Sequence, residues 1–238
     1  MGDDSIRLRS DVSVRLVQHF GSDASVVAAA RVSVEGVESA RHLEADPAPG
    51  LIRYLMRQRH GTPFEHAGMT FAVEAPIFVF REWHRHRVGW SYNETSGRYR
   101  ELEPVFWVPP LDRKVKPAPG FKPARPEFVG GDEHDHELIQ SECAAAYRRA
   151  WDSYRAMLAA GVAREVARAV LPVGTYSSMY ATCNPRSLMH FLSLRTGDAG
   201  ASYPQAEIER AAKLCEAEFA RLFPVTHAAF CEFGRVAP

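Results

Sequence analysis

Five arginines lie within residues 81–100, whose sequence is REWHRHRVGWSYNETSGRYR. Guanidinium groups bind phosphate oxygens through paired hydrogen bonds, and small hydroxyls such as Ser91 and Ser96 add neutral donors. Trp90 and Tyr92 offer aromatic faces on which a base or ring could stack. Because the cations are mixed with Gly, Ser, Asn and aromatic residues directly after an apolar run, the segment predicts a site for a phosphorylated ligand rather than a solvated cationic loop.

A second candidate is the predicted helix over 185–194, within NPRSLMHFLSLRTG, which Asn184 would cap. At 100° per residue, Arg186 and His190 project together on one face, where they could hold an anionic or heteroaromatic ligand. The opposite face carries the apolar stripe of Leu188, Phe191 and Leu192.

Arg195 falls by angle on the apolar side of that helix. Either the helix has ended before it, or Arg195 is a shielded cation that needs an anionic partner. A shielded guanidinium stays charged and could stabilise negative charge on a substrate heterocycle. Spacing alone is equally compatible with a structural ion pair.

Three weaker candidates follow. Arg164 and Arg168 are one helical turn apart, and either could reach a phosphate. Cys183 is the thiol beside a candidate site, so it is either a nucleophile or a buried, inert cysteine. His84 and His86 would share one face of a strand, but the interleaved arginines would repel a dication, so we expect no metal site.

The elements that must position these residues run from strands early in the chain to helices late in it. Strands are predicted over 6–16, over two segments of 69–83 separated by Pro76, and over 105–108. A Pro/Gly-rich loop spans 109–134. Helices are predicted over 23–33, 51–58, 136–160, 164–171, 185–194 and 205–222, with a short tail after Pro224. This order favours an α+β fold.

Composition narrows the function classes. The 238 residues include 29 Lys+Arg and 29 Asp+Glu, and this zero net charge argues against a general nucleic-acid binder. The four cysteines form no CxxC pair and are typical of reduced thiols. No secretory signal and no apolar run of about 18 residues occurs, so we expect a single-domain cytoplasmic protein without a membrane span.

The segment RHRVGWSYNETSGRY, Arg85–Tyr99, resembles the RHR…S motif of flavin-dependent thymidylate synthases. Further similar segments occur in the same order: ARVS at 30–33, HGTPFEH at 60–66, APIFVFREW at 75–83, AREVARAVLP at 163–172 and NPRSLMHFLSLR at 184–195. The resemblance therefore covers most of the chain.

The resemblance implies an α+β domain over 1–238, with a mixed or antiparallel sheet flanked by helices, that assembles as a homotetramer with sites at subunit interfaces. It implies methylation of dUMP to dTMP, with methylenetetrahydrofolate as the carbon source and FAD, reduced by NADPH, as the hydride source. No membrane or nucleic-acid partner is implied.

The resemblance also assigns residues. It implies a flavin site formed by Ser33, Thr62, Glu65, Arg85, His86, Arg87, Glu94, Asn184, Arg186 and His190. It implies a dUMP site formed by Glu82, Arg85, Glu94, Ser96, Gly97, Arg98, Arg168 and Arg195. Arg195 is the principal catalytic candidate, at the uracil, and His60 and Tyr99 are secondary candidates near the folate and flavin.

The chain departs from the family pattern in four places. Eight residues, not seven, separate Arg87 from Ser96, so a bulge is expected near 88–90. Glu82 replaces the family's common Gln. The segment TGDAGASYPQAEI after Arg195 lacks the family's histidine, and the Pro-rich insertion lies outside the motifs.

Two other functions remain open. One is a pyrimidine methyltransferase that uses Cys183 as a nucleophile. The other is a noncatalytic module that binds nucleotides or RNA through the Arg/aromatic segment, although the neutral overall charge counts against RNA.

Overall fold

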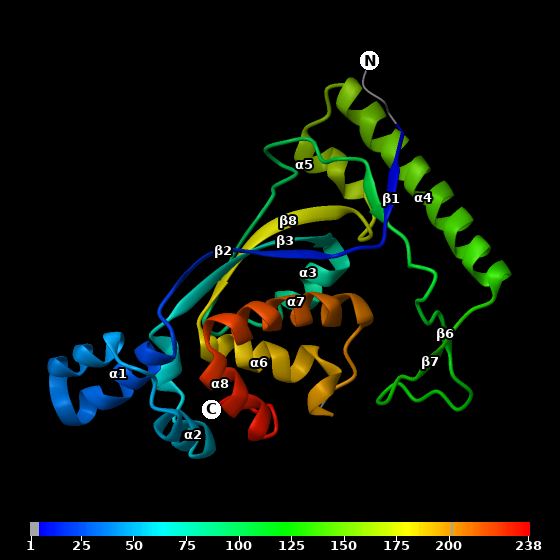
Figure 1. Ribbon diagram of the computed structural model, residues 1–238. Helices are drawn as coiled ribbons and strands as arrows, with labels where there is room; N and C mark the ends of the chain where they lie inside the picture. Colours follow the sequence, from blue (N-terminus) through cyan, green and yellow to red (C-terminus); the bar gives the residue numbers. More distant parts are fainter. Residues whose placement is uncertain (1–4, 201) are drawn as a thin grey trace. The chain divides into compact units, whose positions relative to one another are not determined.

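The computed structural model describes residues 5–200 and 202–238, and its largest sheet has the strand order β2-β3-β8-β4 (Figure 1). These strands are β2 (Ser13–Phe20), β3 (Gly68–Pro76), β8 (Tyr176–Cys183) and β4 (Trp90–Glu94). Thr70 pairs with Thr182 through their hydroxyls, 2.9 Å apart, and Ile77 N donates to Thr175 O at 3.0 Å. Residue numbers rise along β3 while they fall along its partner, so β3 and β8 are antiparallel.

The chain forms two compact units. The first unit consists of the described residues up to Val12, Glu74–Arg81 and Glu94–Ser178; the second consists of Ser13–Val73, Glu82–Asn93 and Met179–Pro238. The boundary falls within strands, because β3 and β8 each contribute residues to both units.

In the first unit, β1 (Arg7–Arg9) pairs in parallel with β5 (Val105–Trp107), and the long helix α4 (Glu133–Ala159) lies beside them (Figure 1). Asp132 caps α4, because its carboxylate accepts from Asp135 N at 2.9 Å. The unit also contains α5 (Arg164–Ala167), η3 (Arg168–Val170), β6 (Lys116–Pro117) and β7 (Phe128–Val129). Its core is formed by Phe106, Val108, Tyr147, Trp151, Tyr154 and Ala167.

The second unit is mainly helical. It contains α1 (Asp23–Glu35), η1 (Gly36–Glu44), α2 (Pro49–Arg57), η2 (Thr62–Glu65), α6 (Pro185–Arg195), η4 (Gly197–Ala199), α7 (Ala206–Leu222) and α8 (Pro224–Glu232). Helix α6 packs against α7, and α7 packs against β2 and α8. Fully buried members of its core include Ile52, Met56, Phe64, Phe191, Phe219, Phe223 and Phe230.

A buried carboxylate joins two distant parts of the second unit. Asp23, 3% exposed, begins α1, and its two oxygens accept from Val225 N at 2.8 Å and Thr226 N at 2.9 Å. The Thr226 hydroxyl adds a bond of 2.6 Å. One side chain therefore satisfies the amides that open α8, which have no partner within their own helix.

Several predicted elements were wrong. The second strand segment of 69–83 is the helix α3 (Ile77–Trp83), so His84 and His86 lie in the turn after a helix and not on a strand. An apolar run of this length does not distinguish a buried helix from a strand. The predicted tail after Pro224 is α8, and the strands β4 and β8 were not predicted. The helices over 23–33 and 205–222 are confirmed as α1 and α7.

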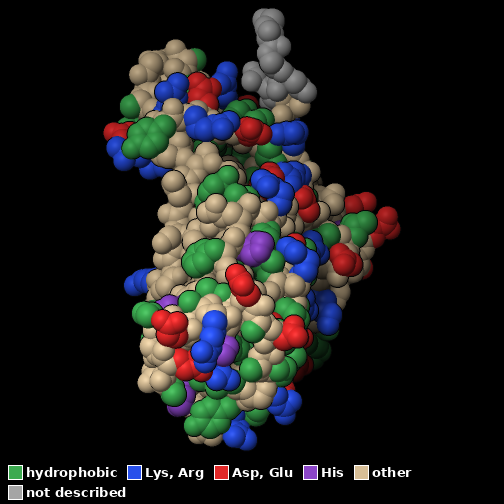
Figure 2. All heavy atoms as spheres, turned by 60° about the vertical axis from the view of Figure 1, so that its left-hand side comes forward, with side chains coloured by type: hydrophobic (Ala, Val, Ile, Leu, Met, Phe, Trp, Pro, Cys, Tyr) green, Lys and Arg blue, Asp and Glu red, His purple; other side chains and the backbone are tan. Residues whose placement is uncertain are grey.

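Among the described residues, no helix is both long and apolar enough to span a lipid bilayer. On the face shown in Figure 2, basic and acidic side chains are interspersed, in agreement with the zero formal charge.

Candidate functional site

A cavity of about 430 Å³ in the second unit gathers many of the predicted flavin-site residues. The predicted residues in its wall are Glu65, Arg85, His86, Arg87, Asn184, Arg186 and His190. Val88, Gly89, Trp90 and Ser187 complete the lining. The wall thus combines several cations, a neutral amide and an aromatic ring, a set of groups that suits an anionic ligand with an aromatic part.

Helix α6 supplies one side of this cavity. Asn184 is its N-cap and accepts from Ser187 N at 2.8 Å, and Pro185 occupies the first helical position. The helical period then directs Arg186 and His190 to the cavity, as predicted, while the apolar stripe is buried. Ser187 was missed, although its spacing of three residues from His190 places both on one face.

Arg186 is fixed from two sides. Its Nη1 donates to the Glu65 carboxylate from η2, and its Nε donates to Pro238 O at 2.7 Å. A Cβ on Gly61 would lie only 2.4 Å from Arg186 Nε, so this glycine permits the close approach. Partial burial and the charge of Arg186 lower the pKa of His190, which favours the neutral imidazole.

Arg195, the last residue of α6, is held by Glu82 and His86 from the segment after β3. We call these three residues the clamp. Its Nη1 donates to Glu82 Oε2 at 2.7 Å, its Nη2 donates to Glu82 O at 3.2 Å, and its Nε donates to His86 Nε2 at 3.0 Å. The Arg195 side chain is 19% exposed. Arg195 is therefore a shielded cation with an anionic partner, and His86 links it to the cavity wall.

The protonation states of the clamp follow from its surroundings. Burial and the nearby charge of Arg195 lower the pKa of His86 to about 4, with a further contribution from His190. His86 is therefore neutral at pH 7 and can accept at Nε2. Burial raises the pKa of Glu82, and the charge of Glu207 acts in the same direction, whereas the charge of Arg195 opposes it.

Aromatic packing holds the segment after α3 against α6. Trp83 stacks on Phe191 with ring centroids 4.8 Å apart, and Trp90 contacts the same ring at 5.5 Å. Tyr92 stacks on Trp90 and donates to the His86 carbonyl, so Tyr92 serves the local structure. The predicted ligand-stacking role of these aromatics is thus limited to Trp90, which lines the cavity.

The extra residue near 88–90 coincides with a close contact. Gly89 has φ +68°, and a Cβ there would lie 2.1 Å from Ser187 Oγ and 3.0 Å from Asn184 Nδ2. Only glycine adopts this left-handed conformation at no steric cost while approaching the helix so closely. The local backbone turn therefore brings the longer segment onto the N-terminus of α6.

Six of the predicted residues lie in the first unit: Glu94, Ser96, Gly97, Arg98, Tyr99 and Arg168. The Ser96 carbonyl accepts from Tyr99 N at 3.0 Å, which closes a turn, and the Ser96 hydroxyl accepts from Arg98 N at 3.3 Å. A Cβ on Gly97 would lie 3.3 Å from Arg168 Cδ, so the turn and Arg168 are neighbours. Arg98 Nε donates to Glu165 Oε2 at 3.1 Å.

Three predicted residues of the second unit, Ser33, His60 and Thr62, lie outside the cavity, as does Tyr99 of the first unit. Ser33 on α1 donates to Ala30 O at 3.3 Å, and His60 makes an edge contact with Tyr54. Thr62 begins η2 and is exposed, and the Tyr99 side chain is 77% exposed. None of these four lines the 430 Å³ cavity.

Cys183, the last residue of β8, is a buried free thiol. Burial raises the pKa of Cys183 far above its ordinary value, which keeps it protonated.

Glu216, His227 and Cys231 form a cluster of potential metal ligands, with ligand atoms within 4.8 Å of one another. However, Arg235 donates to both Glu216 oxygens, at 2.7 and 2.8 Å, so a guanidinium already neutralises this carboxylate.

Comparison with known proteins gives a consistent result. The family model described as "Thymidylate synthase complementing protein" matches residues 15–225. The flavin-dependent thymidylate synthase of Streptomyces coelicolor is 60% identical over 99% of this chain and 97% of its own length. That of Tropheryma whipplei (strain TW08/27) is 48% identical over 96% of each.

A solved structure is also similar to this chain over nearly its whole length. The crystal structure of a UMP/dUMP methylase, PolB from Streptomyces cacaoi, bound with 5-Br UMP has a TM-score of 0.88 and 51% identity to this chain, and covers 98% of this chain and 100% of its own. Identity at this level over nearly the whole length, together with the family match, shows common descent and not merely a shared fold. The chain belongs to the flavin-dependent thymidylate synthase family.

Proposed function

We propose that the protein catalyses the reductive methylation of dUMP to dTMP, with methylenetetrahydrofolate as the carbon donor and NADPH as the reductant of a bound FAD. The observation that carries the proposal is the clamped guanidinium of Arg195, shielded from solvent and linked through His86 to a cavity rich in cations. A charge fixed in this way can stabilise an anion that develops on a heterocycle.

The cavity residues fit the chemistry of FAD. Arg85, Arg87 and Arg186 offer donors for phosphate oxygens, and Trp90 offers an aromatic wall. Neutral His86 accepts from Arg195 at Nε2, so its Nδ1–H is a further donor. When bound, FAD would supply the hydride. The predicted roles of Ser33, Thr62, Glu65, Asn184 and His190 toward the same group remain part of this proposal.

For the nucleotide we propose that the turn at Ser96, Gly97 and Arg98, with Arg168, binds the phosphate of dUMP. Backbone amides of a glycine-containing turn and two guanidinium groups suit a phosphate monoester. Glu82, Arg85 and Glu94 would complete the nucleotide site.

Arg195 retains donors for the substrate. A guanidinium has five N–H groups, and Glu82 and His86 use three of them. The remaining donors could bind a uracil carbonyl and stabilise negative charge on the ring without releasing the clamp. Because Cys183 is protonated, we propose no enzyme nucleophile.

We further propose that the chain acts as one domain, in the cytoplasm, and as a homotetramer whose copies complete each site. Exposed His60, Tyr99 and Ser33 are consistent with completion by a neighbouring copy, with His60 and Tyr99 near the folate and flavin.

The test begins with the visible absorption spectrum of the purified protein. We expect flavin bands that bleach anaerobically with NADPH, and dTMP formation once dUMP and methylenetetrahydrofolate are added. A parallel assay with UMP measures whether the 2′-hydroxyl is accepted. A protein that takes up no FAD and forms no methylated nucleotide would overturn the proposal and favour the noncatalytic binding module.

A further inference from the structure

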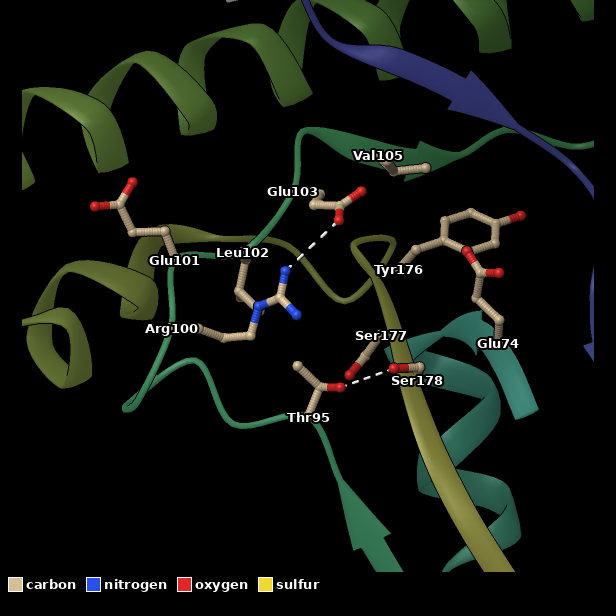
Figure 3. A pocket seen from close by; sticks show the side chains of 10 residues that line it. All are labelled: Glu74, Thr95, Arg100, Glu101, Leu102, Glu103, Val105, Tyr176, Ser177 and Ser178. Atoms are coloured by element: carbon tan, nitrogen blue, oxygen red, sulfur yellow. Dashed lines mark hydrogen bonds and ion pairs between the residues drawn. The ribbon is translucent and has the colours of Figure 1, made fainter. Parts of the chain in front are cut away.

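A second cavity, of about 220 Å³, lies in the first unit at the base of the segment Ser96–Tyr99 (Figure 3). Thr95 and Arg100, the residues that flank this segment, both line it, as do residues of β3, β5 and β8. Its ten lining residues are Glu74, Thr95, Arg100, Glu101, Leu102, Glu103, Val105, Tyr176, Ser177 and Ser178. None of them belongs to the flavin or nucleotide site proposed above.

Arg100 supplies the positive charge of this cavity. Figure 3 shows its guanidinium extending between the acidic residues and the hydroxyl groups. Its Nη2 lies 3.7 Å from Glu103 Oε1, which is too long for a hydrogen bond. Its N–H donors are therefore available to a ligand.

The three carboxylates in the wall are neutralised by other arginines. The pairs are Arg9 with Glu74, Arg155 with Glu101 at 2.8 Å, and Arg7 with Glu103 at 3.0 Å. Asp11 shares Arg9 at 2.6 Å, and Arg164 lies 4.0 Å from Glu101, so five arginines face four carboxylates in all. The excess charge favours an anion over a cation as the occupant.

Hydroxyl groups on the β8 side of the cavity provide further donors. Thr95 Oγ1 and Ser178 Oγ are 2.7 Å apart, and such a pair uses one of its two protons, so one proton remains free. Ser177 is 8% exposed, and its buried Oγ has no hydrogen-bond partner among the described residues. A buried hydroxyl without a partner destabilises the fold unless a ligand or water pairs with it.

We propose that this cavity binds a small molecule bearing an oxyanion, a carboxylate or phosphate, through Arg100, Ser177 and the Thr95–Ser178 pair. Leu102, Val105 and Tyr176 would contact a short carbon skeleton. The volume equals that of roughly seven waters, which is too small for a whole nucleotide. Because Thr95 and Arg100 bracket the turn proposed to bind phosphate, occupancy strengthens dUMP binding; this consequence rests on the proposed function.

The experiment is calorimetric titration of inorganic phosphate, and separately of succinate, into protein already saturated with dUMP. Saturation fills the nucleotide phosphate position, so remaining binding reports the second site. We expect at least one probe to bind, and the stronger one identifies the oxyanion. We expect Arg100→Gln to weaken binding about tenfold and Ser177→Ala about fivefold. Arg221→Gln, an exposed arginine on α7, is the matched control and leaves binding unchanged.

Absence of binding by both probes would overturn the proposal, as would affinities that Arg100→Gln leaves unchanged. If dUMP itself does not bind, the proposed function fails separately. The titration is then repeated on the unliganded Arg98→Gln variant, in which the turn is weakened as an anion site. Sensitivity of the remaining binding to a second substitution, Arg100→Gln, would still support the cavity site.

Discussion

In the second unit the Arg195 side chain is 19% exposed and makes three hydrogen bonds. In the first unit the Arg98 side chain is 53% exposed, and among the described residues it forms one ion pair, with Glu165. A buried charge requires partners, so Arg195 is oriented before any ligand arrives. An exposed ion pair contributes little and is easily exchanged for a phosphate. We therefore expect substitutions in the second unit to affect turnover and those in the first unit to affect affinity.

The largest effect is expected for Arg195→Ala. Loss of a preoriented charge should lower kcat for dTMP formation about 100- to 1,000-fold, while the flavin content, measured by absorbance, stays near that of the wild type. Leu194→Ala, at an exposed neighbour on α6, is the control and should retain activity. Turnover at the wild-type rate in Arg195→Ala would remove the catalytic role of this residue.

A smaller effect of a different kind is expected for Arg98→Gln. The KM for dUMP should rise about tenfold with little change in kcat, because a charge-assisted hydrogen bond to the phosphate is lost. Glu165→Gln, which frees Arg98 from its carboxylate, should not raise KM. Equal losses in kcat and kcat/KM for Arg98→Gln would contradict the contrast between the units.

The clamp should also make the thermal stability of the protein depend on pH. The pKa of His86 is lowered from 6.5 to about 4, so the folded state binds its proton less readily than the unfolded state. The stabilisation is present above pH 6.5 and is lost as the pH falls towards 4. Glu82, whose pKa is raised, acts in the opposite sense. We expect the Tm of the wild type to fall more over this range than that of His86→Asn, and parallel curves would exclude a titrating His86.

The smallest effect is expected for Cys183→Ala. The thiol is buried and protonated, so kcat should stay within about twofold of the wild type. Steady-state rates measured on protein of matched flavin content test this. Complete loss of activity in a folded variant would revive the thiol-nucleophile mechanism.

The candidate site was most predictable where a helical period governs it. Arg186 and His190 were correctly predicted to share one face, because Asn184 fixes the start of α6 and 3.6 residues per turn fixes the rest. The partner of Arg195 was not predictable in this way. Glu82 lies 113 residues away in the sequence, and only tertiary packing brings it within 2.7 Å.

The strand β8 shows why part of the fold was missed. Its buried positions Met179, Ala181 and Cys183 alternate with less buried Ser178, Tyr180 and Thr182, but Ser177 is buried and Tyr180 is exposed. Polarity therefore does not follow burial along this strand, and the usual alternating signal is weak. Helix α3 was predicted as a strand for a different reason. Its residues Ile77–Phe80 are uniformly apolar, so they show no periodic pattern that would distinguish a helix from a strand.

The Asp23 cap bears on how the protein is made. The second unit consists of three separate stretches of chain. The Asp23 carboxylate that caps the N-terminus of α8 lies about 200 residues before the amides it binds. During synthesis, the Asp23 carboxylate on α1 lacks these amide partners until residues 225–226 have left the ribosome. We therefore expect the second unit to complete its folding only after residues 225–226 have emerged, with contacts of high sequence separation formed last.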